Sequence, residues 1–159
     1  WVHTDFAGCQ KTRESTSGGV AMYGGHCLKT WSVTQDVVAL SSGEAELYVI
    51  VKGATYALGL KSMMADLGLE VSIKINTDAS AALGMVKRRG VGKVRHVEVR
   101  ELWVQDKVQK GEMQVCNVRS AENLADVLTK YVPQHRMSET LWRMGFELRG
   151  GRHELNPTL

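Results

Sequence analysis

Four acidic residues and one histidine stand where their side chains could do chemistry. The stretch VHTDFAGC, residues 2–9, is typical of a short strand that runs into a glycine turn, and it carries His3 and Asp5 on one face. Glu46 lies at the start of a predicted helix and Asp126 lies early in another, while Asp78 ends a predicted strand, where open α/β sheets place ligands. Taken singly, such acids are usually caps or surface charges. Together they are candidate ligands for a hard divalent cation, which prefers oxygen atoms.

These residues depend on the elements that position them, and the hydrophobic pattern predicts both strands and helices. Strands are expected within 2–9 and at 19–23, 26–32, 71–78 and 113–118, and helices at 41–68, 79–89, 94–111 and 120–132. Residues 11–19 are expected to form a loop, and Gly24-Gly25 a tight hairpin turn. Ser42 is the expected N-cap of the long helix, Gly68 its end, and Glu44 a first-turn acid favoured by the helix dipole. A hairpin followed by β-α units implies an α/β fold with a mixed sheet and helices on its faces.

Composition narrows the class of protein. The 159 residues suffice for one domain, and a hydrophobic content of 43% with 23% charged residues is ordinary for a globular protein. No apolar run is long enough to span a bilayer and nothing at the start resembles a signal peptide, so we expect no membrane partner and an intracellular location, not a secreted protein. The three cysteines lack metal-site spacing and are expected to be inert thiols. A strand that begins almost at Trp1 suggests a piece of a longer polypeptide.

Positive charge is concentrated in one segment. Between residues 87 and 100, six basic residues face a single acid, which leaves a local net charge of +5 within a chain of net charge +3. Such a concentration is typical of a surface that faces nucleic acid, although a solvated basic loop would have the same composition. The candidate nucleic-acid-binding residues are Lys87, Arg88, Arg89, Lys93, Arg95 and His96.

Five sequence blocks resemble one known family. RESTSGG, VALSSGEAEL, INTDASAA, KVRHVEVRELWVQDKV and ENLADVLTK are similar, in order and spacing, to the ribonuclease H domain of copia-type retrotransposon Pol polyproteins. The resemblance implies a ribonuclease H-like fold over residues 1–133, with a five-stranded mixed sheet and helices on both faces, and residues upstream of the first strand are expected to be missing. Residues 134–159 remain a C-terminal tail to which the sequence assigns no role.

The resemblance also implies an activity and a site. The family hydrolyses the RNA strand of RNA–DNA hybrids with two divalent metal ions, Mg²⁺ or Mn²⁺, held by four carboxylates. Asp78 matches the family's strand-4 aspartate, Asp126 the last-helix aspartate, and Glu46 the helix glutamate. The implied partners are an RNA–DNA hybrid and a reverse transcriptase domain upstream in the same polyprotein, in a cytoplasmic particle or the nucleus.

The first strand departs from the family's pattern of Asp-x-Asp, in which the first aspartate is catalytic. Aligned on Asp-Phe-Ala-Gly, Asp5 is the second aspartate and His3 occupies the catalytic position. Asp5 would lie about 6.5–7 Å further along the strand and could serve only if the strand slides. Alternatively His3 offers a nitrogen, which suits Mn²⁺ or Zn²⁺ better than Mg²⁺. We favour impaired catalysis.

Three functions follow as hypotheses. The first is a working metal-dependent ribonuclease H, and the second a decayed domain that binds or tethers a hybrid without cleaving it. The third is an integrase-like polynucleotidyl transferase of the same fold. It is disfavoured because the helix glutamate here precedes the strand-4 aspartate, an order that resembles ribonuclease H.

Overall fold

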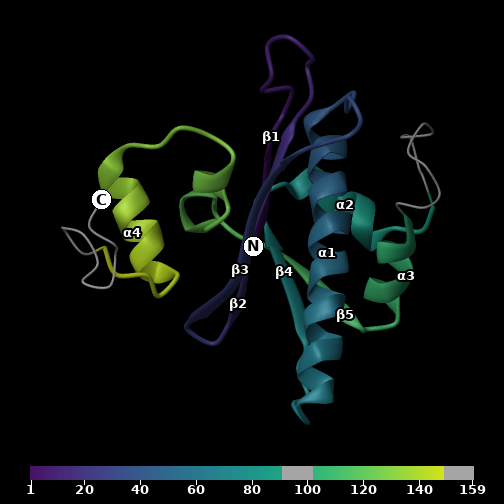
Figure 1. Ribbon diagram of the computed structural model, residues 1–159. Helices are drawn as coiled ribbons and strands as arrows, with labels where there is room; N and C mark the ends of the chain where they lie inside the picture. Colours follow the sequence, from purple (N-terminus) through teal and green to yellow (C-terminus); the bar gives the residue numbers. More distant parts are fainter. Residues whose placement is uncertain (91–101, 149–159) are drawn as a thin grey trace.

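A computed structural model describes residues 1–90 and 102–148 (Figure 1). The strands are β1 (Val2–Asp5), β2 (Thr16–Tyr23), β3 (His26–Thr34), β4 (Ile73–Thr77) and β5 (Met113–Asn117). The α-helices are α1 (Ser42–Asp66), α2 (Ser80–Lys87), α3 (Trp103–Gln109) and α4 (Gln134–Arg143), and two 3₁₀ turns are η2 (Ser120–Glu122) and η3 (Asp126–Leu128). In Figure 1, β1, β2 and β3 lie between α4 on one side and α1, α2 and α3 on the other.

The strands of the described residues pair as two sheets. β1, β2 and β3 form an antiparallel meander, whereas β4 and β5 form a separate parallel pair. The predicted mixed α/β class is therefore confirmed, but the strands are joined as three and two and not as one five-stranded sheet. β1 and β4 are neighbours, and α1 packs against both of them, so this helix holds the two sheets together.

Strand β2 begins three residues earlier than expected, within the segment predicted as a loop. Two of its residues, Gly18 and Gly19, have low strand propensity, which explains the wrong prediction. Both positions require glycine, because neighbouring side chains on opposite faces of the strand occupy the space that a Cβ would fill. A Cβ at Gly19 would lie 1.8 Å from the ring of Trp31, and one at Gly18 would lie 2.7 Å from Cγ2 of Thr129. Tertiary packing thus overrides local preference here.

Helix α1 is the longest element of the described residues, and its N-cap lies one residue before the expected one. Ser41, not Ser42, is the N-cap, and its hydroxyl accepts the backbone N–H of Glu44. Glu44 lies in the first turn as predicted, and Gly68 follows the helix with a φ of +76°. The main core joins α1 to both sheets through buried apolar side chains, among them Val2, Leu47, Ile50, Ile75 and Val115.

Residues 120–132 do not form the predicted helix. Two 3₁₀ turns are separated by residues 123–125. The backbone of Asn123 is extended (φ −75°, ψ 107°), and its side-chain oxygen accepts the N–H of Ala125. Asparagine competes with helix formation through such local hydrogen bonds. The predicted helix at 94–111 is described only from residue 102, and its described part contains α3.

The segment 134–148 packs back onto the rest of the chain. Met144, at the end of α4, is 2% exposed and lies in a second apolar cluster with Val20, Leu124 and Val127. The side chain of Arg143 donates hydrogen bonds to the backbone carbonyls of residues 121 and 122. The described part of the expected tail therefore contributes to the packing of β2 and of the two 3₁₀ turns.

Candidate metal centre

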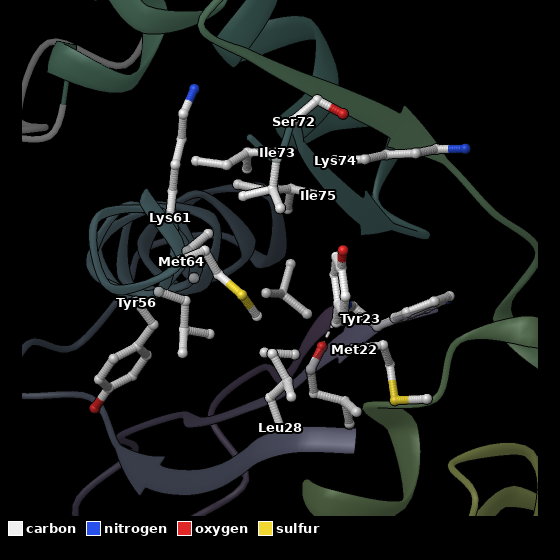
Figure 2. A pocket seen from close by; sticks show the side chains of 18 of the residues that line it. Met22, Tyr23, Leu28, Tyr56, Lys61, Met64, Ser72, Ile73, Lys74 and Ile75 are labelled. Atoms are coloured by element: carbon white, nitrogen blue, oxygen red, sulfur yellow. Dashed lines mark hydrogen bonds between the residues drawn. The ribbon is translucent and has the colours of Figure 1, made fainter. Parts of the chain in front are cut away.

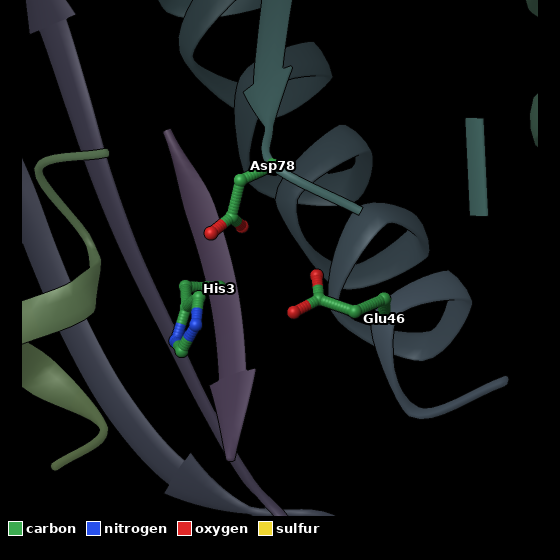
Figure 3. Close-up of side chains that lie close together, drawn as sticks. All are labelled: His3, Glu46 and Asp78. Atoms are coloured by element: carbon green, nitrogen blue, oxygen red, sulfur yellow. The ribbon is translucent and has the colours of Figure 1, made fainter. Parts of the chain in front are cut away.

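Three ionisable side chains from three elements converge where β1, β4 and α1 meet (Figure 3). His3 comes from β1, Glu46 from the second turn of α1, and Asp78 from the residue directly after β4. One ligand atom of each lies within 4.8 Å of the others. The predicted proximity of Glu46 and Asp78 is found in the structure, and His3 is the third member of the group.

Glu46 is buried in the gap between the two sheets, with 7% of its surface exposed. Its Oε1 accepts the backbone N–H of Thr4 at 3.1 Å, and its Oε2 accepts the hydroxyl of Thr77 at 3.4 Å. Burial raises the pKa of Glu46 to about 7, the charge of Asp78 adds to this rise, and the two hydrogen bonds oppose it. Near neutral pH this carboxyl therefore changes charge easily.

Asn123 connects β1 to the carboxylate after β4. Its side-chain amide is 3% exposed and donates to the carbonyl oxygen of Val2 at 2.9 Å and to Oδ1 of Asp78 at 3.1 Å. Sequence reasoning placed Asn123 inside a helix and gave it no role. A signal existed, because asparagine is unfavourable within a helix and favours a cap or a turn.

His3 is mostly buried, with 12% of its side chain exposed. Its Nδ1 lies 2.6 Å from the hydroxyl oxygen of Thr129, and that hydroxyl donates to the carbonyl of Asp126. The ring is therefore held between this hydroxyl and Asp126, whose Oδ1 lies 3.5 Å from Nε2. Burial lowers the pKa of His3, and Lys130 lowers it further, against the opposing charges of Asp78, Asp126 and Asp5.

Asp126 lies beside His3 and is not a member of this group. Its Oδ1 is 3.5 Å from Nε2 of His3, and its side chain is 1% exposed. Two cations balance its charge: Lys130 contacts Oδ1, and Arg136 of α4 lies 2.9 Å from Oδ2. Among the described residues, the three-membered group thus contains His3 where Asp126 was expected. Asp126 contacts His3, which is itself a member of the group.

Asp5 has a local structural contact. Its Oδ1 accepts the backbone N–H of Thr16, which closes the loop between β1 and β2. Gly8 leaves room for this carboxylate, because a Cβ there would lie 1.9 Å from Oδ2 of Asp5. Asp5 is not a member of the converging group.

The donor atoms fit one divalent ion. Metal–oxygen distances of about 2.1 Å place ligands on opposite sides of an ion about 4.2 Å apart, and the three ligand atoms here lie within 4.8 Å of one another, so small movements of the side chains would bring them to one ion. Two carboxylates with one imidazole favour Mn²⁺ or Zn²⁺ over Mg²⁺, because imidazole is a softer ligand than oxygen. A second ion would need Asp126, whose oxygens are already held by Lys130 and Arg136.

The predicted nucleic-acid-binding residues are described only in part. Lys87 and Arg89 are exposed at the end of α2, and Arg88 is half-buried between them. Nε of Arg89 donates to the side chain of Gln109 in α3 at 2.8 Å. Lys93, Arg95 and His96 lie outside the described residues.

The molecule is thus a mixed α/β protein with a histidine and two carboxylates at the junction of its two sheets. Its sequence is 28% identical over 138 residues, 86% of this chain, to the retrovirus-related Pol polyprotein from transposon TNT 1-94 of Nicotiana tabacum. It is 26% and 25% identical, over 79% of the chain, to the corresponding polyproteins from transposons RE2 and RE1 of Arabidopsis thaliana. The chain is therefore similar to one part of several retrotransposon Pol polyproteins.

The matched region covers only 9–10% of the length of these relatives. No family model and no solved structure matches the chain. Within the described residues, no helix combines the length and the apolar character needed to cross a membrane.

Proposed function

We propose that this chain is a ribonuclease H-type domain of a retrotransposon Pol polyprotein, which acts on the RNA strand of RNA–DNA hybrids. The observation that carries the proposal is the convergence of Glu46 and Asp78 beside the position that His3 occupies in β1. The order of these residues along the chain and the relation to Pol polyproteins support the same function.

The side chains suggest how such a domain would work. Glu46, Asp78 and His3 would hold a divalent ion, and a bound metal would activate water and stabilise charge on the phosphate. Asn123 donates to Asp78 and fixes its orientation, and Thr129 contacts Nδ1 of His3 and fixes the ring. Lys87 and Arg89, exposed at the end of α2, would neutralise phosphates of the hybrid.

A second candidate function is hybrid binding without cleavage. It is favoured by the pairing of Asp126 with Lys130 and Arg136, which occupies the carboxylate expected to serve a second ion. A domain with one ion site lacks the paired clamp on the attacking and leaving oxygens that a two-metal mechanism uses.

One assay separates the two functions. The chain is mixed with a labelled RNA–DNA hybrid and with Mg²⁺ or Mn²⁺, and RNA cleavage and hybrid affinity are both measured. We expect slow cleavage with Mn²⁺ and less with Mg²⁺, because His3 supplies a nitrogen ligand. Binding without cleavage in either metal would support the second function. The triple variant Lys87→Glu, Arg88→Glu, Arg89→Glu should bind at least about tenfold more weakly at low salt, and unchanged affinity would remove this surface from the proposal.

A further inference from the structure

An open groove of about 600 Å³ lies between η3 and the first turn of α4. Its apolar lining includes Leu128, Val132 and Met137. The lining also includes Thr129, whose hydroxyl oxygen lies 2.6 Å from Nδ1 of His3. The groove therefore adjoins the candidate metal centre.

Tyr131 forms part of this groove and is fully exposed to solvent. Its ring adds nothing to the apolar core, although aromatic side chains usually contribute large buried areas to a fold. Tyr131 follows Thr129 by two residues, so the Cα atoms of the two residues lie within about 7.6 Å of each other. The ring is thus available to a planar ligand close to His3.

The charge of the groove favours an anionic ligand. Among the described residues that line it, Lys130 is positively charged and none is acidic. Arg136 lies nearby, because Arg136 and Lys130 both contact the carboxylate of Asp126. Two cations against one carboxylate leave a net charge of +1, and the side chains of Lys130 and Arg136 are 49% and 37% exposed. A phosphate can therefore approach both cations from solvent.

A second hollow, beside the start of β1, does not adjoin the metal centre in this way. It is a cavity of about 130 Å³ between the C-terminal half of α1, β4 and the β2–β3 hairpin (Figure 2). Most of its lining side chains are apolar, and its lining contains neither Thr129 nor a member of the converging group. The groove, not this cavity, therefore shares a residue with the surroundings of His3.

We propose that the groove binds an unpaired nucleotide of a nucleic acid strand, with the base stacked on Tyr131 and the phosphate held by Lys130 and Arg136. Bases stack on exposed aromatic rings with little sequence preference, while cationic side chains follow the phosphates. The proposal rests on the proposed function, because it names a subsite for the nucleic acid of that function. Stacking accepts RNA and DNA alike, so the test includes an unpaired segment of each kind.

The test compares three labelled RNA–DNA hybrids that share one duplex. The first has blunt ends, in the second the RNA strand extends unpaired at both ends, and in the third the DNA strand does so. The unpaired segments carry the fluorescent base 2-aminopurine, and the two single strands alone complete the set. Affinity at low salt and 2-aminopurine fluorescence are measured in EDTA, so that cleavage plays no part. We expect the natural chain to bind at least one extended hybrid about tenfold more tightly than the blunt hybrid, and to quench its 2-aminopurine.

Three variants locate the binding. Tyr131→Ala should abolish both the preference for the extended hybrid and the quenching, whereas Tyr131→Phe should retain both because it keeps an aromatic ring. Trp142→Ala is the matched control, because Trp142 is an aromatic residue of α4 that is 76% exposed and lies outside the groove lining. This control should retain the preference and the quenching.

Equal affinities of the natural chain for the blunt and the extended hybrids would overturn the proposal and leave the proposed function intact. A preference that survives in Tyr131→Ala, or that Trp142→Ala loses equally, would also overturn it. A preference for one extended hybrid only would support the proposal and identify the strand that enters the groove. Binding of single strands that depends on Tyr131, without binding of the blunt hybrid, would support the groove and count against the proposed function.

Discussion

The gap between β1 and β4 is filled in two different ways at its two ends. Where β4 ends, side chains cross the gap: Glu46 accepts the N–H of Thr4, and Asn123 donates to the carbonyl of Val2. At the other end, beside Trp1, the same gap is an apolar cavity. Backbone groups on the open edge of β1 are thus satisfied by side chains at the polar end. We infer that polar side chains, not strand pairing, fix the distance between the two sheets there. Four predictions test this contrast between the two ends.

The largest effect is expected at the polar end, for His3→Asp. A carboxylate at this position would give the site a third anionic oxygen donor, so Mg²⁺-dependent cleavage of a hybrid should rise about a thousandfold, or about 4 kcal/mol in transition-state free energy. Adding Asp5→Asn should change this restored activity little, because Asp5 binds the N–H of Thr16 and not the group. Full activity in the natural sequence, lost with Asp5→Asn, would show that Asp5 is the ligand.

The next effect concerns the charge of Glu46. Its pKa in the folded chain, about 7, is above its ordinary value, so its contribution to stability is complete below about pH 4.5 and is lost as pH rises through 7. The free energy of unfolding should fall by roughly 3 kcal/mol over this range because of Glu46. The pKa of His3 is lowered in the folded chain, so His3 changes stability with pH in the opposite direction. The natural chain is therefore compared with Glu46→Gln, a variant that removes only the contribution of Glu46.

Urea unfolding at pH 5 and pH 8, without metal, measures this difference. Glu46→Gln should be more stable than the natural chain at pH 8, and the gap should narrow at pH 5. Added Mn²⁺ should stabilise the natural chain at pH 8 more than the variant, because a metal bound to the ionised form shifts folding toward the native state. Parallel pH profiles for the two proteins would contradict the assignment.

A smaller effect is expected for Asn123→Ala. The variant leaves the carbonyl of Val2 and one oxygen of Asp78 without their donor, and should lose about 2 kcal/mol of stability. Asn117→Ala is a matched control, because Asn117 is exposed at the end of β5. Chemical denaturation compares the two, and equal losses would mean that Asn123 does not hold the sheets together.

The smallest effect on stability is expected at the end of the gap that contains the apolar cavity. Leu60→Ala removes a half-buried side chain from the cavity wall and should cost about 1 kcal/mol or less. Ile50→Ala, in the fully packed part of α1, should cost about 2–5 kcal/mol. Similar losses, measured by urea unfolding, would indicate that the cavity is closed in solution.

Local sequence patterns were sufficient to predict most of the strands and the positions of two of the ligand candidates. Glu46 at a helix start and Asp78 after a strand could be placed from hydrophobic periodicity, which also predicted four of the five strands closely. The arrangement of β1 beside β4 could not be predicted, because it depends on Glu46 and Asn123, whose side chains cross a gap between distant segments. The same holds for Arg136, whose contact with Asp126 needs α4 to fold back. The beginning of β2 was missed because its glycines serve packing and not strand propensity.

The hydrogen bond from Asn123 to Val2 has a consequence for the order of folding. It joins residues 121 positions apart, and the contact between His3 and Thr129 spans 126 positions. Closing a loop of this length costs about 4 kcal/mol of chain entropy before any contact is made. During synthesis from the N-terminus, the carbonyl of Val2 and the ring of His3 therefore gain these hydrogen bonds only after nearly the whole domain has been made. The meander of β1, β2 and β3 can form early, whereas Asp78 and His3 gain their hydrogen bonds to Asn123 and Thr129 only when residues 123–129 have been made and docked.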